Sequence, residues 1–267
     1  MEKYMREIEL EELKKIQLEI MQVVHDFCVD NKIDYSLTYG TLIGVIRHKG
    51  YIPWDDDIDI CMTRPEYNKF IKMFNNKNER YKVYSFELNN NYPFPFAKII
   101  DTHTVLIEKS DIKFKMGINI DLFPIDAVDA KQIVLKRQIR LKKIYNVKVV
   151  KLVKSRKLHK NFILFVGKLL FIFIPLKLIV KLMCNNASHY NYDSSNYVSC
   201  VAFGSKNNQP IKKEIFSKYL LLPFENKEFF VMEGYDQYLK SIYGDYLELP
   251  PKNEQITHHA FKAFYID

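Results

Sequence analysis

The chain has 267 residues, 48% of them hydrophobic, including 19 Phe and 18 Tyr. This content excludes a disordered chain and is enough for one large domain or for a core domain with insertions. The formal net charge of +8 is unevenly distributed, because residues 131–192 hold 15 Lys and Arg and no Asp or Glu. The remainder holds 25 basic and 32 acidic residues, so the positive charge belongs to one segment.

The N-terminal part of the chain predicts a protein without a leader. The first 15 residues are highly charged and contain no apolar run, which predicts no signal peptide. Apolar residues then recur at helical spacing over 5–30, which predicts an amphipathic packing helix without a chemical role. The four cysteines show neither metal-ligand nor redox-motif spacing, so we expect reduced thiols in a cytosolic protein.

A small-residue turn follows this helix. Residues 34–38 read as a short strand that ends at Gly40, and the segment from Thr41 to Arg47 reads as a helix. A strand, a glycine turn and a helix N-terminus together present backbone N–H groups to a phosphate. We therefore expect Gly40 and Thr41 to contact phosphate.

An acidic cluster stands immediately after it. Apolar residues at 58, 60 and 62 alternate with polar ones, which predicts a strand beginning near 57. Because residues two apart share a face of a strand, three of the carboxylates would line one side and Asp56 would point the other way. The three carboxylates are those of Asp55, Asp57 and Asp59.

Four carboxylates this close repel one another unless a positive charge neutralises them. A hard cation such as Mg²⁺ takes oxygen ligands and leaves positions for substrate phosphates. The alternative is an acidic turn before an edge strand. The cluster runs into an apolar strand, which a solvated turn would not require, and this favours the metal site.

Residues 40–60, GTLIGVIRHKGYIPWDDDIDI, resemble the signature of the LicD family, which is similar in sequence to the fukutin-related proteins. The resemblance implies a nucleotidyltransferase-like fold. It also implies transfer of phosphocholine, or a related phospho-alcohol, from a CDP-linked donor to a hydroxyl of a glycan, with release of CMP. It covers residues 35–126 strongly and 220–251 moderately.

Strands and helices continue after the signature. Pro65 opens a predicted helix over 66–75, and alternating patterns predict strands over 81–87, 96–100, 104–108 and 116–124. Asp121 lies in the last of these, opposite a buried aliphatic row, where a carboxylate is unusual unless it is paired or bound to a metal. The alternative is an exposed strand aspartate or a turn former. Asp126 and Asp129 are expected to cap the next helix.

The resemblance and the pattern together predict the site residues. An acidic residue at Asp121 completes the family's carboxylate set, so the predicted ligands of Mg²⁺ or Mn²⁺ are Asp55, Asp57, Asp59 and Asp121. The catalytic carboxylates are Asp57, Asp59 and Asp121, the last also serving as base. The predicted phosphate contacts are Gly40, Thr41, Arg47, His48 and Lys98, although a single Lys or Arg is more often a surface cation. The quaternary ammonium of choline would sit against aromatic rings, for which the candidates are Trp54, Tyr51 and Tyr243.

The basic segment reads as a helix over 130–160, followed by an almost wholly apolar run over 162–184. Lys168, Pro175 and Lys177 interrupt that run, which disfavours a spanning helix. A segment that lies on an anionic membrane surface and a buried helical hairpin remain alternatives. A nucleic-acid patch is disfavoured because few aromatic residues are placed for base stacking.

The predicted fold class is α/β (α+β), a nucleotidyltransferase-like mixed sheet flanked by helices with a basic and apolar helical insertion. The core would occupy 1–129, the insertion 130–200, and the part that completes the catalytic domain 201–267. The expected partners are CDP-choline, a glycan or glycolipid acceptor such as lipopolysaccharide or teichoic acid, and the inner face of the cell membrane, without nucleic acid. Two alternatives are a nucleotidyltransferase that uses a nucleoside triphosphate and a non-catalytic membrane-surface scaffold.

Overall fold

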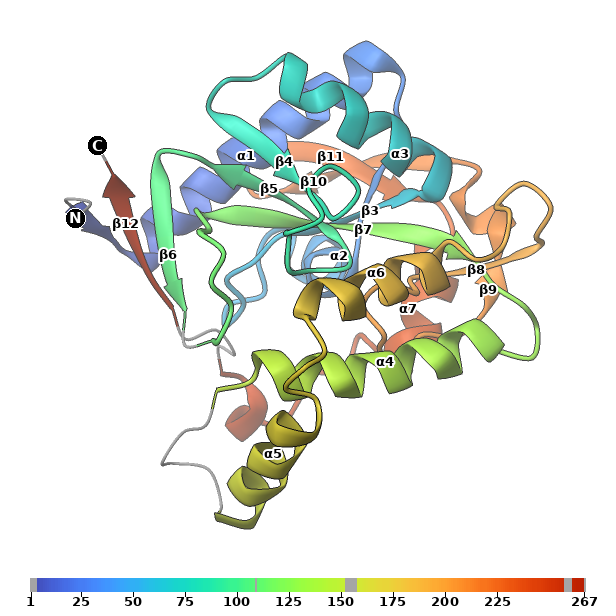
Figure 1. Ribbon diagram of the computed structural model, residues 1–267. Coiled ribbons are helices and arrows are strands. Elements are labelled where there is room, and N and C mark those ends of the chain that lie inside the picture. Colours follow the sequence, from blue (N-terminus) through green and yellow to red (C-terminus); the bar gives the residue numbers. More distant parts are fainter. Residues whose placement is uncertain (1–3, 109, 152–157, 257–260, 267) are drawn as a thin grey trace.

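A mixed sheet lies at the centre of the fold (Figure 1). The computed structural model describes residues 4–108, 110–151, 158–256 and 261–266. Five strands follow one another across the sheet, in the order β2 (Ser36–Leu37), β3 (Asp59–Thr63), β7 (Asn119–Ala127), β5 (Ala97–Asp101) and β4 (Tyr81–Tyr84). The far end of β7 also pairs with β8 (Tyr197–Ser199), which pairs with β9 (Ile211–Lys212). The mixed α/β content confirms the predicted fold class.

The two central strands, β3 and β7, run parallel, and the other pairs within this sheet are antiparallel. Asp59 at the start of β3 is registered with Asp121 near the start of β7. Both strands are rich in aliphatic residues, which are buried because helices cover the sheet. The parallel register therefore brings two acidic residues from distant parts of the sequence to the same end of the sheet.

Three helices hold this arrangement. α1 (Leu10–Asn31) contacts β5 and β7, and its buried residues recur every three or four positions, as an amphipathic helix requires. α3 (Arg64–Met73) contacts β3 and β7, with Pro65 in its first turn. α2 (Tyr39–His48) contacts β3 and leads from the strand β2 towards the acidic turn.

Both ends of the chain take part in sheets. β1 (Tyr4–Ile8) pairs with β12 (Phe261–Ile266), which pairs with β6 (Thr104–Glu108). The hairpin of β10 (Tyr219–Phe224) and β11 (Lys227–Met232) contacts β2, and α7 (Tyr235–Tyr243) contacts α2. Three short 3₁₀ turns complete the elements: η1 (Phe74–Asn76), η2 (Lys213–Phe216) and η3 (Lys252–Glu254).

The described part of the basic segment forms three helices, α4 (Ile133–Val149), α5 (Leu158–Leu170) and α6 (Leu176–Ala187). α6 packs along α4, and Pro175 stands at its N-cap. α5 projects from the lower edge of the molecule in Figure 1 and leaves much of its apolar face exposed, so the apolar run is not a buried hairpin throughout. Among the described residues, no helix is both long and apolar enough to cross a bilayer. Part of the helix predicted over 130–160, residues 152–157, lies outside the described residues.

Two local predictions are corrected. The predicted strand near 57 begins at Asp59, so Asp55 and Asp57 lie in the turn before it and strand alternation does not place them. Asp126 does not cap a helix; its carboxylate accepts two hydrogen bonds from the Arg64 guanidinium, at 2.6 and 2.9 Å. Asp129 does cap α4, because it accepts hydrogen bonds from the backbone N–H groups of the first turn.

Candidate active site

Four carboxylates gather at the end of the sheet where β3 and β7 begin. Asp59 and Asp121 are neighbours across the parallel ladder, and the N–H of Asp121 donates to the carbonyl of Ile58 over 2.9 Å. The acidic turn closes when the N–H of Asp55 donates to the carbonyl of Ile52, also over 2.9 Å. The predicted carboxylates therefore come from two strands and one turn, and they come together in space.

The electrostatics of Asp59 show how closely these charges approach. The pKa of Asp59 is raised well above its ordinary value, first by burial and then by the negative charges of its three acidic neighbours, Asp57, Asp121 and Asp55. The ammonium of Lys98 opposes this shift without cancelling it. Burial and the neighbouring carboxylates therefore both disfavour the charged form of Asp59.

Lys98 is part of the site. It stands opposite Asp121 in the antiparallel β5–β7 pair, and its ammonium forms an ion pair with the Asp121 carboxylate. The same ammonium donates to Oδ1 of Asn119 over 3.0 Å. The structure thus brings together the predicted residues Lys98 and Asp121, with Asn119 as a further partner that the sequence did not single out.

The turn before α2 abuts the carboxylates. Oγ1 of Thr41 accepts the N–H of Asp59 over 2.8 Å, and a Cβ on Gly40 would lie 2.7 Å from Oδ2 of Asp55, too close for any other residue without movement. Tyr39 adopts a φ of 47°, a left-handed conformation that non-glycine residues rarely hold. The first backbone N–H groups of a helix have no intrahelical partner, and here the helix begins beside the Asp55 carboxylate.

Gln17 supports the acidic turn and was missed from sequence. Its Nε2 donates to the carbonyl of Asp56 over 3.1 Å and to that of Asn119 over 3.2 Å, which ties α1 to both the turn and β7. Gln17 is buried on the apolar side of α1. A buried amide among aliphatic residues at helical spacing is the signal that would have found it.

A pocket of about 70 Å³ opens beside these groups, lined by residues that include Asp57, Lys98 and Asp121. This is room for an ion and a few waters, since about 10–15 Å³ of such volume holds one water. Among the described residues, no three His, Cys, Asp or Glu side chains already converge as a set that could hold a metal. The hard oxygen donors and their mutual repulsion suit a divalent cation, but binding one requires these side chains to turn towards it.

Arg47 and His48, two predicted phosphate contacts, lie in the last turn of α2 beside Trp54, a predicted choline contact. The Arg47 guanidinium donates to the carbonyls of Tyr246 and Glu248, at 3.1 and 3.2 Å, and to the ring of His48. The pKa values of Arg47 and His48 are lowered by burial, and that of His48 also by the charge of Arg47. Trp54 packs edge-on to His48, with ring centroids 6.4 Å apart. The hydrogen bonds of Arg47 to Tyr246 and Glu248 join α2 to the segment after α7.

Two of the aromatic candidates lie near the carboxylates. The pKa of Tyr243 is raised by burial and then by the charges of Asp59, Asp55 and Asp57, so α7 brings this phenol to the site. The pKa of Tyr51 is raised by burial, by Glu225 and by the acidic turn. The Tyr51 ring already carries the Lys14 ammonium 4.6 Å from its centroid, whereas the Tyr243 side chain is partly exposed.

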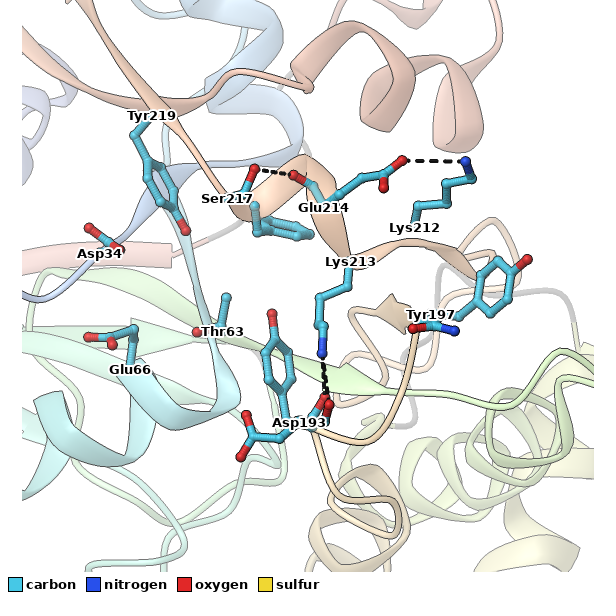
Figure 2. Close-up of a pocket in the computed structure, with 13 residues that line it drawn as sticks. Asp34, Thr63, Glu66, Asp193, Tyr197, Lys212, Lys213, Glu214, Ser217 and Tyr219 are labelled. Carbon is cyan, nitrogen blue, oxygen red and sulfur yellow. Dashed lines mark hydrogen bonds and ion pairs between the residues drawn. The ribbon is translucent and has the colours of Figure 1, made fainter.

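A larger pocket, of about 720 Å³, lies at the opposite end of β3 (Figure 2). Its wall includes Thr63, at the last position of β3, and Glu66 in the first turn of α3. The ammonium of Lys213 donates to the backbone carbonyls of Tyr192 and Asp193, as Figure 2 shows in part. None of the predicted site residues lines this pocket, so size alone does not identify the site.

Comparisons with known proteins identify the family. A family described as "LicD/FKTN/FKRP, nucleotidyltransferase domain" matches residues 32–149, which contain all the carboxylates of the cluster. The lipopolysaccharide cholinephosphotransferase LicD of Haemophilus influenzae is 32% identical over 270 aligned positions, covering 98% of this chain and 100% of that protein. An uncharacterised protein of Rickettsia typhi is 42% identical over 52 residues, 19% of this chain and 17% of its own length. The chain belongs to the LicD family and is a phosphotransferase of that family.

Proposed function

We propose that the protein transfers phosphocholine from CDP-choline to a hydroxyl of a cell-surface glycan, or of its lipid-linked precursor, and releases CMP. The relative of known activity, a lipopolysaccharide cholinephosphotransferase, supports a phosphocholine group and a glycan acceptor. The observation that carries the proposal is the cluster of carboxylates beside Lys98 and the N-terminus of α2. Such a cluster suits a substrate with two phosphates, provided that a cation mediates between the two sets of negative charges.

We propose Mg²⁺ or Mn²⁺ as that cation, held by Asp57, Asp59 and Asp121 with Asp55 as a possible fourth ligand. The metal supplies neutralisation of charge on the phosphates and on the leaving oxygen. In this proposal, the backbone N–H groups of Gly40 and Thr41 orient the donor's pyrophosphate at the helix N-terminus.

Lys98 and Asp121 have the remaining roles in the proposed reaction. Lys98 holds Asp121 in place and adds a positive charge beside the reacting phosphate. As the acceptor oxygen bonds to the distal phosphorus, its proton passes to the Asp121 carboxylate, and the bond from phosphorus to the oxygen of CMP breaks. The product is a phosphodiester on the sugar.

The reaction is tested by incubating the purified protein with CDP-choline, a lipopolysaccharide-type glycolipid acceptor and Mg²⁺. We expect CMP and choline-labelled acceptor in equal amounts, and neither product when EDTA removes the metal. Pyrophosphate release from a nucleoside triphosphate, with no CMP from any CDP-alcohol, would instead support the alternative that the protein is a nucleotidyltransferase. Absence of every metal-dependent product would favour the scaffold.

The choline headgroup gives a second prediction. Tyr243→Ala and Trp54→Ala should weaken the use of CDP-choline more than that of CDP-glycerol, because only choline carries a cation for the aromatic face. The expected loss in kcat/KM is about 0.5–2 kcal/mol, or roughly 2- to 30-fold, for the choline donor. Tyr197→Ala, which removes a partly exposed ring lining the pocket of Figure 2, is the matched control. An equal loss for both donors would show that the rings support the fold rather than the choline group.

A further inference from the structure

The exposed apolar surface of α5 and of the turn that follows it is the most unusual surface of the molecule. Phe173 is 94% exposed, Leu170 74% and Phe162 67%. With Ile163, Leu169 and Ile172, these residues form what we call the α5 apolar face. Contiguous exposed apolar side chains of this size mark a surface that another phase or molecule covers.

The helix is held so that this face points outwards. On its inner side, Gly167 lies against α4, where a Cβ would be 3.1 Å from the side chain of Val147. Lys168 forms an ion pair with Asp111 at 2.7 Å and donates to the carbonyl of Lys148 over 3.3 Å. The face is therefore the outer half of a helix whose inner half is anchored, rather than a helix that has lost its partner.

The charge around the face identifies what covers it. Residues 131–192, which contain α4, α5 and α6, carry 15 Lys and Arg without one Asp or Glu. On α6, exposed Lys177 and Lys181 alternate with exposed Leu178 and Leu182, which repeats the pairing of cations with aliphatic side chains. A second protein chain would meet this surface with scattered charges of both signs, whereas an anionic bilayer offers uniform negative charge above an apolar layer.

The length of the helix defines the mode of contact. α5 has 13 residues, about 20 Å at 1.5 Å per residue, which is shorter than the roughly 30 Å apolar core of a bilayer. We infer that α5 and the turn at 171–173 insert into one leaflet of an anionic membrane, parallel to its surface, while the lysines of α4 and α6 contact the headgroups. The inference goes beyond the transfer reaction and does not depend on it.

The position of α5 relative to the active site makes this contact useful to a glycolipid-modifying enzyme. Asp111, the ion-pair partner of Lys168, also donates its N–H to the carbonyl of Val149 at the end of α4. The segment that begins there leads into β7, the strand that carries Asp121. A short segment of chain therefore joins the residue that anchors α5 to the strand that holds a predicted catalytic carboxylate.

The test is co-sedimentation of the purified chain with vesicles, without substrate. We expect the wild type to bind phosphatidylglycerol-containing vesicles at low salt and to bind pure phosphatidylcholine vesicles at least tenfold more weakly. Leu170→Asp/Phe173→Asp should reduce binding to the anionic vesicles at least tenfold. Leu221→Asp, at an exposed leucine of the β10–β11 hairpin, is the matched control and should bind as the wild type does.

Two results would overturn the inference. One is a wild type that does not sediment with anionic vesicles at low salt, or sediments with them no better than the double variant does. The other is a wild type that is a dimer by light scattering and a double variant that is a monomer, with neither binding vesicles, which would assign the α5 apolar face to a second copy of the chain. Circular dichroism of the double variant verifies that it is folded, as expected for substitutions at exposed positions.

Discussion

Asp59→Asn is expected to lower turnover of the proposed transfer by about a thousandfold or more, and Asp57→Asn by a similar factor. Each substitution removes one charged oxygen donor from the proposed metal site while leaving the size of the side chain unchanged. The measurement is the rate of CMP release from CDP-choline at saturating Mg²⁺. Asp30→Asn, which removes an exposed carboxylate on α1, is the matched control and should retain full activity.

The same variants should separate metal binding from folding. The pKa of Asp59 is raised in the folded protein, mainly by burial and by its acidic neighbours, so the folded state binds more protons than the unfolded state between about pH 3.9 and that raised pKa. The free energy of unfolding of the metal-free protein therefore falls as pH rises through this window. Above the raised pKa, the whole destabilisation caused by the charged Asp59 is present. At neutral pH the metal-free Asp59→Asn protein should have a Tm at least as high as that of the wild type.

Mg²⁺ or Mn²⁺ should reverse this order, because a cation that binds only the folded state stabilises it by an amount that grows with the logarithm of its concentration over Kd. The wild type should gain more than either variant, and differential scanning fluorimetry with a metal titration measures the difference. Equal gains in Tm for all three proteins, together with retained activity, would show that the metal does not bind at the carboxylate cluster. A drop in metal-free Tm for Asp59→Asn would instead indicate that the Asp59 carboxylate is satisfied without metal.

Local patterns predicted much of this site because its parts are close in sequence. The turn at Gly40, the acidic run and the helix between them lie within about twenty residues. Hydrophobic alternation predicted the strand β7 and marked Asp121 as a lone carboxylate in it. Pairing Asp121 with Asp59 required the parallel register of β3 and β7, which no local pattern specifies. Here the family resemblance supplied what the residues alone did not.

The remaining differences come from contacts between distant parts of the chain. β1 pairs with β12 across almost the whole sequence, and neither strand has a strong period of two. β12 was therefore not predicted, and the helix predicted over 5–30 is wrong at residues 5–8, which lie in β1. Asp126 was predicted to cap a helix because it precedes one, but its actual partner is Arg64, the first residue of α3. Gln17 likewise acts through backbone carbonyls about forty and a hundred residues away.

The Arg64–Asp126 pair gives the last prediction. Arg64 follows β3 directly and Asp126 lies near the end of β7, so their bidentate bond joins the two parallel strands at the end opposite the active site. The side chains are only 13% and 1% exposed. Burial raises the pKa of Asp126, and the guanidinium partly offsets that shift. Arg64→Met would leave a buried carboxylate without its cation and should cost about 3–5 kcal/mol of the free energy of unfolding.

Denaturant unfolding measures that cost, and two further variants identify its origin. Arg64→Met/Asp126→Leu removes both charges and should recover most of the loss, since the penalty lies in the unpaired carboxylate rather than in the missing attraction. Lys240→Met, which breaks the exposed pair with Asp236, should leave the unfolding midpoint nearly unchanged. If the double variant is no more stable than Arg64→Met, the pair itself, and not relief of a buried charge, stabilises the sheet. Because the backbone ladder fixes the register of Asp59 and Asp121, the double variant should retain transferase activity. This result would show that the Arg64–Asp126 pair at one end of β3 and β7 is not needed for the chemistry at the other end.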